Sequence, residues 1–315
     1  MNLLDGFALA QQWLFEMAVE PAMYRIGLGA LLEDGYAATG WLLVGIAQVA
    51  LMATLLRLLE RWRPVEPVVD RAAVREDIVY TLIHRLGVFR LLTYFAVDPL
   101  VFAFAGEARQ AGWSAFALDA IVPGVTDRAW VSFVIYLLVF DLVDYAIHRA
   151  QHGVRWWWKL HALHHSQRQM TLWSDSRNHL VDDLLRDAIF GLVALAIGVA
   201  PEQFVAVVAL RQLGESLAHA NLRLGFGPWL GRVLVGPRYH RLHHAIGAGV
   251  ATAAAERVRD CNFAVLFPLW DLLFGSARFD DRYPPTGIRD QLDGRDYGRG
   301  FWAQQWLGLK RLAGR

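Results

Sequence analysis

Histidine is the residue type in this chain whose number and spacing point most directly to chemistry. Ten of the eleven histidines lie between residues 148 and 244, and eight of the ten form three short clusters. The clusters are His148 and His152; His161, His164 and His165; and His240, His243 and His244. Imidazole is a common protein ligand for iron, zinc, copper and nickel. Because eight clustered histidines exceed what one ion coordinates, the sequence predicts two metal ions.

The spacing inside each cluster suits helices that carry metal ligands. Residues three or four positions apart share a helix face, so His148 and His152 can bind one ion together. In each of the other clusters the second histidine lies three positions after the first, and the third lies four positions after the first. Each of these clusters can therefore present ligands to two ions. Three such clusters predict metal binding far more strongly than one pair would.

Other polar residues near the clusters are candidates for supporting roles. His179 and His219 lie between the second and third clusters, and spacing alone leaves open whether each binds metal or only makes hydrogen bonds. Asp144 lies one helical turn before His148, and Asp141 about one turn earlier. A carboxylate in an apolar span is costly without a partner, and the free N–H of a ligand histidine is a natural one. We therefore expect both carboxylates to support catalysis.

The composition indicates a membrane protein. Hydrophobic residues make up 55% of the 315 residues, mean hydropathy is +0.28, and there are 13 tryptophans and 17 phenylalanines. A soluble protein of this size needs a more polar surface. The net charge of +1 gives no indication of nucleic-acid binding. Because Cys261 is the only cysteine, an internal disulfide, a cysteine-based zinc site and an iron–sulfur cluster are excluded.

Hydropathy predicts an all-α integral membrane protein with about three transmembrane helices and a helical hairpin. The spans are expected at residues 39–59, 83–105 and 129–148, and the hairpin at residues 184–219 with its tip at Pro201. No cleavable signal-peptide pattern occurs at the N-terminus, so we expect these internal spans to insert the chain. The more polar region 245–315 is expected to belong to a cytoplasmic, helical, histidine-rich cap.

The distribution of arginine predicts the orientation. Residues 1–38 contain one arginine and five acidic residues, whereas six arginines occur between residues 57 and 85. The positive-inside rule places that second stretch in the cytoplasm and the N-terminus outside. Two further crossings and the hairpin then bring all three histidine clusters to the cytoplasmic side, which is the inner-membrane cytoplasmic face if the source is bacterial.

Four motifs occur together over roughly residues 130–290. They are Asp141-x-x-x-Tyr145-x-x-His148-Arg149-x-x-His152, His161-x-x-His164-His165-Ser166, His240-Arg-Leu-His243-His244, and Asp260-x-Asn262-Phe263 followed by Trp270-Asp271-x-Leu-Phe274-Gly275. This set resembles the fatty acid hydroxylase/sterol desaturase superfamily. The resemblance implies N-terminal spans in residues 1–128, a catalytic domain in residues 129–290 and a tail in residues 291–315.

The resemblance also implies the cofactor and its ligands. Members of that superfamily are integral membrane, non-haem di-iron oxygenases that use O2 and external electrons, and their histidine signature maps onto the eight clustered histidines. Arg177-x-His179 and His219-Ala-Asn221 resemble further family elements, which implies ligand roles for these two histidines as well. Zinc can replace iron in purified protein, since it stands higher in the general affinity order. The chain lacks the His-Pro-Gly-Gly haem signature of fused members, so a separate donor is expected, either ferredoxin-like or b-type cytochrome-like with its reductase.

The expected reaction is hydroxylation of an unactivated C–H bond in a lipid, whether fatty acyl, sterol or hopanoid, or carotenoid. Desaturation by the same superfamily is the first alternative. A haem-binding electron-transfer protein is the second, but histidines clustered at span ends disfavour it. A metal transporter would need more polar residues in the first two spans, and a zinc hydrolase would need a motif such as His-Glu-x-x-His, which is absent.

Overall fold

The computed structural model describes residues 3–246 and 260–314, and these residues form helices without any strand. The helices of the N-terminal half are α1 (Leu3–Leu14), α2 (Glu20–Arg25), α3 (Leu32–Leu51), α4 (Arg57–Trp62), α5 (Arg71–Arg85), α6 (Val88–Ala96), α7 (Asp98–Gln110) and α8 (Ala129–Gly153). Those of the C-terminal half are α9 (Arg155–His165), α10 (Leu180–Ile197), α11 (Pro201–His219), α12 (Gly227–Leu230), α13 (Pro237–His243), α14 (Leu269–Leu273) and α15 (Phe301–Leu312). The predicted all-α class is confirmed for this part of the chain.

Two of the described helices are long and apolar enough to cross a membrane. One runs continuously from Gly29 to Trp62, because a π-helical turn at Met52–Leu56 joins α3 to α4. The other is α8. A third crossing exists if α5 and α6, whose axes bend by 53°, count as one broken span. The first and third predicted spans, 39–59 and 129–148, therefore lie inside real helices.

The second predicted span, residues 83–105, is wrong as a single straight helix. Helix α5 ends at Arg85, and Gly87 adopts a left-handed conformation with φ of 85°. Such a conformation suits glycine and ends a helix. A second break at Val97 precedes α7, which has Pro99 in its first turn. Hydropathy summed over this window does not register either break, because the residues on both sides are equally apolar.

The predicted hairpin is confirmed. Helix α10 ends at Ile197, Gly198 takes the left-handed conformation with φ of 69°, and α11 begins at Pro201. Proline at the start of a helix lacks an N–H that would have no partner there, and its fixed φ is already helical. The hairpin therefore turns at the place where the sequence has its glycine and proline.

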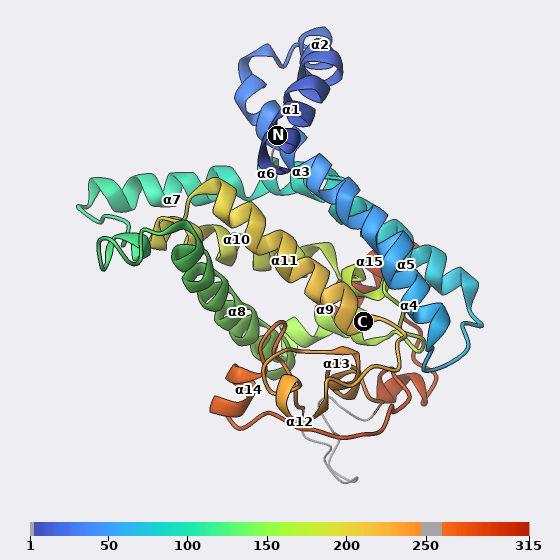
Figure 1. Ribbon diagram of the computed structural model, residues 1–315. Helices are drawn as coiled ribbons and strands as arrows, with labels where there is room; N and C mark the ends of the chain where they lie inside the picture. Colours follow the sequence, from blue (N-terminus) through green and yellow to red (C-terminus); the bar gives the residue numbers. More distant parts are fainter. Residues whose placement is uncertain (1–2, 247–259, 315) are drawn as a thin grey trace.

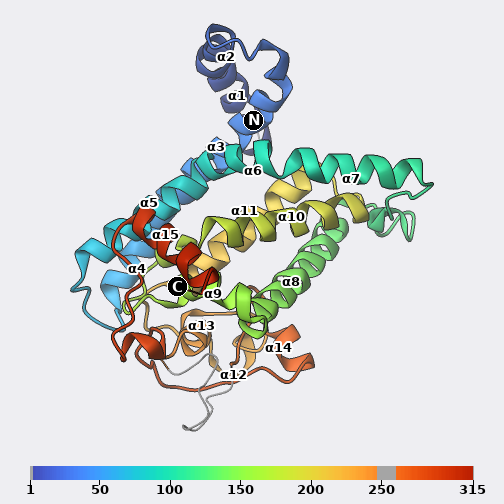
Figure 2. The same ribbon diagram turned by 180° about the vertical axis from the view of Figure 1, so that it is seen from behind.

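The long helices converge on one end of the molecule. In both ribbon views α1 and α2 project at the opposite end, while α9, α13 and α14 gather around the C-terminal ends of α8 and α11 (Figures 1 and 2). Helix α9 packs on α8, and α13 packs on α11. This packing brings together the elements that carry the histidine clusters. The C-terminal helix α15 packs against α9 and α5. Of the predicted cap, residues 247–259 lie outside the described residues.

Both apolar and polar contacts fix the helices in the interior. Phe140 of α8 stacks on Phe190 of α10 with ring centres 5.2 Å apart and contacts Phe204 of α11 edge-on. At the other side of the hairpin, the buried guanidinium of Arg85 donates to Gln48 of α3 and forms an ion pair with Asp175 at 2.7 Å. An arginine buried in this way remains stable only with such partners. The network ties α3, α5 and the segment before α10 together.

Helix α3 approaches α5 so closely that only glycine fits at position 45. A Cβ on Gly45 would lie 1.7 Å from the carbonyl oxygen of Arg85. We expect Gly45→Ala to lower the free energy of unfolding by about 1–3 kcal/mol, the usual cost of overpacking a core. Thermal unfolding followed by tryptophan fluorescence in detergent measures the change. The control is Gly106→Ala in α7, where only the tip of Arg109 comes within 4.0 Å. Equal midpoints for the two variants would contradict the close approach of α3 to α5.

Candidate metal centre

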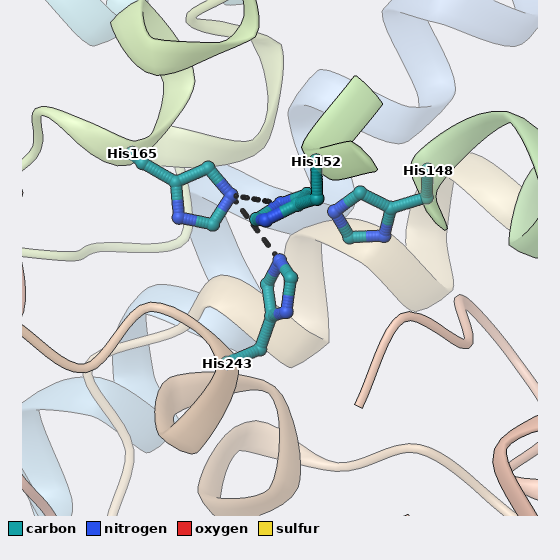
Figure 3. A group of neighbouring side chains, drawn as sticks. All are labelled: His148, His152, His165 and His243. Atoms are coloured by element: carbon teal, nitrogen blue, oxygen red, sulfur yellow. Dashed lines mark hydrogen bonds between the residues drawn. The ribbon is translucent and has the colours of Figure 1, made fainter. Parts of the chain in front are cut away.

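Eight buried histidines form two groups of four in the described part of the chain. The first group contains His148, His152, His165 and His243, and the second contains His164, His219, His240 and His244. Within each group one ring nitrogen from every histidine lies within 4.8 Å of the others. Figure 3 shows the rings of the first group pointing toward one another from three separate segments of the chain. The two groups together contain seven of the eight clustered histidines and the single residue His219.

Helix geometry explains how neighbouring residues reach different groups. His148 and His152 lie one turn apart on α8 and belong to the same group. At the end of α9, His164 and His165 are adjacent in sequence, so their side chains point about 100° apart around the helix. His164 therefore belongs to the second group, and His165 belongs to the first. Around α13, His243 joins the first group, while His240 and His244 join the second.

The spacing of the Nε2 atoms fits metal coordination. Five pairs of these atoms lie 3.0–3.2 Å apart: His152 with His165, His165 with His243, His164 with His219, His219 with His240, and His240 with His244. Two nitrogens bound at about 2.1 Å and at right angles around one ion are about 3.0 Å apart. A single Nε2 cannot donate to one neighbour and accept from another, so hydrogen bonding alone does not satisfy His165, His219 or His240. A cation between the rings does.

The opposite ring nitrogen, Nδ1, is fixed by carbonyl groups in three of these histidines. His148 Nδ1–H donates to the Phe263 carbonyl at 2.8 Å, and His243 Nδ1–H donates to the Cys261 carbonyl at 2.7 Å. His219 Nδ1–H donates to the Glu215 carbonyl one turn earlier in α11, at 2.8 Å. Since a carbonyl can only accept, each proton must reside on Nδ1. The Nε2 lone pair is then free for a metal ion, the usual arrangement of ligand histidines.

Burial keeps these imidazoles neutral. Burial, followed by the neighbouring imidazoles, lowers the pKa of His164, His165 and His244 well below its ordinary value. The pKa values of His240 and His243 are lowered in the same way. A histidine must be unprotonated to bind metal. At neutral pH the centre therefore presents a set of neutral nitrogen donors.

The loop at residues 261–267 supplies the carbonyls that orient two of the grouped histidines. Asn262 holds the loop in a left-handed conformation with φ of 61°, and its amide bonds to the backbone of Tyr239 and Arg278. The carboxylate of Asp271 accepts the N–H groups of Phe263 and Ala264 at 3.0 and 2.8 Å. The Asp271 carboxylate thereby fixes the loop that orients His148 and His243. In the sequence, Asp271 and Asn262 stand out only as members of the fourth motif, and the sequence assigns neither a function.

Asp141, predicted as a catalytic residue, supports the same loop from α8. Its carboxylate accepts the N–H groups of Leu266 and Phe267 at 2.8 and 3.2 Å and the indole N–H of Trp270 at 2.9 Å. The two buried carboxylates of Asp141 and Asp271 thus accept five N–H groups from the loop and the helix after it. Among the described residues, the Asp141 carboxylate forms no hydrogen bond or ion pair with a histidine.

Asp144, the other predicted catalytic residue, does not have the expected partner. Its two oxygens pair with the guanidinium groups of Arg186 at 2.8 Å and Arg211 at 3.2 Å, whereas His148 donates to the Phe263 carbonyl instead. The expected Asp144–His148 hydrogen bond is therefore replaced by two ion pairs to the α10–α11 hairpin. A fully charged guanidinium is a stronger partner for a buried carboxylate than a neutral imidazole.

Two further predicted ligands lie outside the two groups. His161 is adjacent to both, with its ring centre 5.2 Å from that of His148 and from that of His164. Its Nδ1 lies 3.2 Å from Asp182, and its buried Nε2 has no protein partner. His179 instead caps α10: its Nδ1 accepts the Val181 N–H, and its Nε2–H donates to the Gln305 carbonyl. Both nitrogens of His179 are thus engaged, and the structure brings it to neither group.

The support given by Asp271 can be tested through metal content. Asp271 accepts four hydrogen bonds, two from the loop and two from the hydroxyls of Tyr239 and Ser276. An asparagine there has one acceptor oxygen, so Asp271→Asn should weaken metal binding by about 10- to 100-fold, as loss of ligand support typically does. Metal titration of stripped protein measures this. The control Asp127→Asn alters an exposed turn remote from the centre. Unchanged affinity in Asp271→Asn would contradict the positioning role.

Comparisons with known proteins agree with this geometry. The sequence profile of the fatty acid hydroxylase family matches residues 133–276, which include all eight residues of the two groups. An ornithine lipid hydroxylase from Rhizobium tropici is 26% identical over 79% of this chain and 71% of its own length. No solved structure matches the chain significantly.

Two other relatives match about half of the chain. An alkylglycerol monooxygenase from Caenorhabditis elegans is 28% identical over 50% of this chain and 29% of its own length. A Δ7-sterol 5(6)-desaturase from Gibberella zeae is 24% identical over 47% of this chain and 42% of its own length. The matches to these two therefore span less than half of either relative. Together with the histidine geometry, the profile and the relatives support the resemblance of this chain to the fatty acid hydroxylase/sterol desaturase superfamily.

Proposed function

We propose that this protein is a membrane-bound non-haem di-iron monooxygenase that hydroxylates an unactivated C–H bond of a lipid with O2 and electrons from a separate donor. The observation that carries the proposal is the pair of adjacent, buried four-histidine groups. One group alone would suit a structural zinc site equally well. Two groups linked by His161, whose ring lies about equally close to both, suit two ions that act together.

The residues of the chain bind and orient the ions and keep water away. Two iron ions supply the activation of O2 that attack on a saturated C–H bond requires, which no side chain can provide. The eight grouped histidines, with His161 as a ninth candidate, would hold them. We do not retain His179 as a ligand, because its Nε2 carries a proton and its Nδ1 accepts a backbone N–H. Asp182, which contacts His161, is the buried carboxylate best placed to offset the positive charge.

A cavity supports the choice of a lipid as substrate. A volume of about 420 Å³ lies between α3, the α5–α7 region and the α10–α11 hairpin, and its far end is lined by apolar residues such as Phe102, Leu195 and Phe204. Such a volume falls in the usual range of ligand sites. The named relatives act on ornithine lipids, alkylglycerols and sterols. These names support a lipid substrate here. They differ in head group, so the head group must be inferred from the residues that line the cavity.

Desaturation is the second candidate, and it is favoured by one observation, the sterol desaturase among the relatives. Hydroxylation and desaturation require the same histidine donors and differ in how the substrate presents its second hydrogen. The haem alternative has no comparable support. A bis-histidine haem needs two facing imidazoles on opposite sides of a large planar ring, whereas here the imidazole nitrogens converge within 4.8 Å. We infer that the electrons come from a separate ferredoxin-like or b-type cytochrome-like protein.

We also propose that the metal centre faces the cytoplasm. The backbone carbonyl of Arg63, in the arginine-rich stretch after the first span, accepts the backbone N–H of Arg223, close to the end of α11. Glu60, one turn earlier, accepts the N–H of Asn221. The first span thus ends beside the metal centre, and so does α8. Two spans that run in the same direction need a crossing between them, which supports α5 and α6 as one broken span.

The metal content of neighbouring histidine variants tests the two-ion proposal. Wild-type protein should contain two ions per chain. His164→Ala and His165→Ala should each lose about one ion and all turnover, because the two side chains belong to different groups. Mass spectrometry of total metal measures the content, with zinc counted as well as iron because zinc binds more tightly. The control His179→Asn keeps a residue suited to capping a helix and should retain both ions.

Two results would contradict this proposal. One is full turnover and two ions in His164→Ala. The other is loss of both ions in His179→Asn while the protein remains folded, because this would make His179 a ligand.

Reporter fusions test the orientation. Fusions after Arg63, Glu107 and Arg315 should report cytoplasm, outside and cytoplasm, respectively, because α5 and α6 are expected to cross between the first two sites. A cytoplasmic signal after Glu107 would make α5–α6 a re-entrant segment. A signal outside after Arg315 would overturn the cytoplasmic placement of the metal centre.

A further inference from the structure

The lipid-sized cavity described above leads directly toward the metal centre. It follows α10 from Leu195 to Asp183, a distance of about 18 Å by helix rise. At its polar end it shares five wall residues with a second, smaller cavity of about 40 Å³: Asp175, Asn178, Asp183, Arg186 and Glu215. The smaller cavity is lined by histidines of both groups, including His148 and His219. The shared residues form a polar neck between an apolar chamber and the metal centre.

Every arginine in the wall of the larger cavity already has a carboxylate partner. Arg85 pairs with Asp175 at 2.7 Å, and Arg90 pairs with Asp98 at 3.0 Å. On the other side, Arg186 and Arg211 each pair with Glu215, at 2.9 and 3.0 Å, and both also pair with Asp144. The described wall therefore offers no guanidinium that lacks a carboxylate. A phosphate or carboxylate head group would have to break an existing ion pair in order to bind.

Asp187 is the exception among the acidic residues of the wall. Asp183, one turn away on α10, contacts His84 at 2.9 Å, but Asp187 forms no ion pair in the described structure. Its one hydrogen-bond donor is the hydroxyl of Thr93 at 3.2 Å. That hydroxyl has a single proton and lies equally close to the Phe89 carbonyl, at 3.2 Å. The Asp187 carboxylate thus faces the cavity with at most part of one hydrogen bond.

We propose that Asp187 binds a primary ammonium group of the substrate, so that the enzyme acts on a lipid whose head group carries a free amine. The inference rests on the proposed lipid oxidation and names the substrate class. A carboxylate removed from water is stabilised strongly by a cation that also donates hydrogen bonds. An ammonium has three N–H donors, which suits both oxygens of Asp187. The apolar residues toward the hairpin tip then accommodate the hydrocarbon chain.

Binding of two matched lipids to the full-length protein in detergent tests the proposal. The probes are sphinganine, a long-chain primary amine, and N-acetylsphinganine, in which the same nitrogen is uncharged. Native mass spectrometry measures retention of each lipid. Wild-type protein should bind the amine at least about tenfold more tightly, the usual effect of a hydrogen-bonded charge pair. Asp187→Asn should remove this preference, Asp187→Glu should keep most of it, and the control Glu202→Gln, at an exposed position of the same hairpin, should leave it unchanged.

The outcomes separate this inference from the proposed function. Equal binding of both lipids by wild-type protein overturns the role of Asp187, even if Asp187→Asn fails to fold. A preference that survives in folded Asp187→Asn overturns it as well. Turnover of both probes is followed separately by the mass of the oxidised product. If the amine preference depends on Asp187 but no lipid is oxidised in the reconstituted system, the binding site stands and the proposed reaction fails.

Discussion

The structure around the candidate metal centre depends on holding many neutral imidazoles with their lone pairs directed at one another. Nε2 atoms only 3.0–3.2 Å apart are favourable in a buried site when a cation lies among them. The protein reaches this geometry with histidines from α8, α9, α11 and the end of α13, so no single helix defines either group. The packing of these four helices at one end of the molecule is therefore a requirement of the donor set.

The second requirement is a fixed tautomer, and the chain meets it in two ways. His219 donates to a carbonyl of its own helix, one turn back, so α11 alone sets its orientation. His148 and His243 instead donate to the loop at residues 261–267, which is remote in sequence from both. That loop has a backbone conformation that needs Asn262, and it stays in place through the buried carboxylates of Asp141 and Asp271. Asp141 and Asp271 form no hydrogen bond with either imidazole. By holding the loop whose carbonyls accept the Nδ1 protons, they leave the Nε2 lone pairs of His148 and His243 free to bind a metal ion.

Sequence reasoning succeeded where the determining interactions are local. The hairpin turn at Gly198 and Pro201 follows from backbone preferences of those residues, and ligands four residues apart follow from the helix period. It failed where distant segments compete for one group. Asp144 was expected to bind His148, a neighbour on the same helix face, but two arginines far along the chain take its oxygens. The break after Arg85 also escaped prediction, because hydropathy records the apolar residues around Gly87 and not its backbone conformation.

Helix α10 explains how the metal centre and the lipid-sized cavity can influence each other. Asp182 contacts His161 beside the metal ligands, whereas Asp183 contacts His84 and lines the neck. One turn later, Arg186 secures Asp144 of α8 and Asp187 faces the chamber. Because these four residues occupy two successive turns of one rigid element, a displacement of α10 that moves the Asp187 carboxylate also moves the support of His161. A single helix thus carries both part of the chamber wall and the carboxylate that supports a candidate ligand.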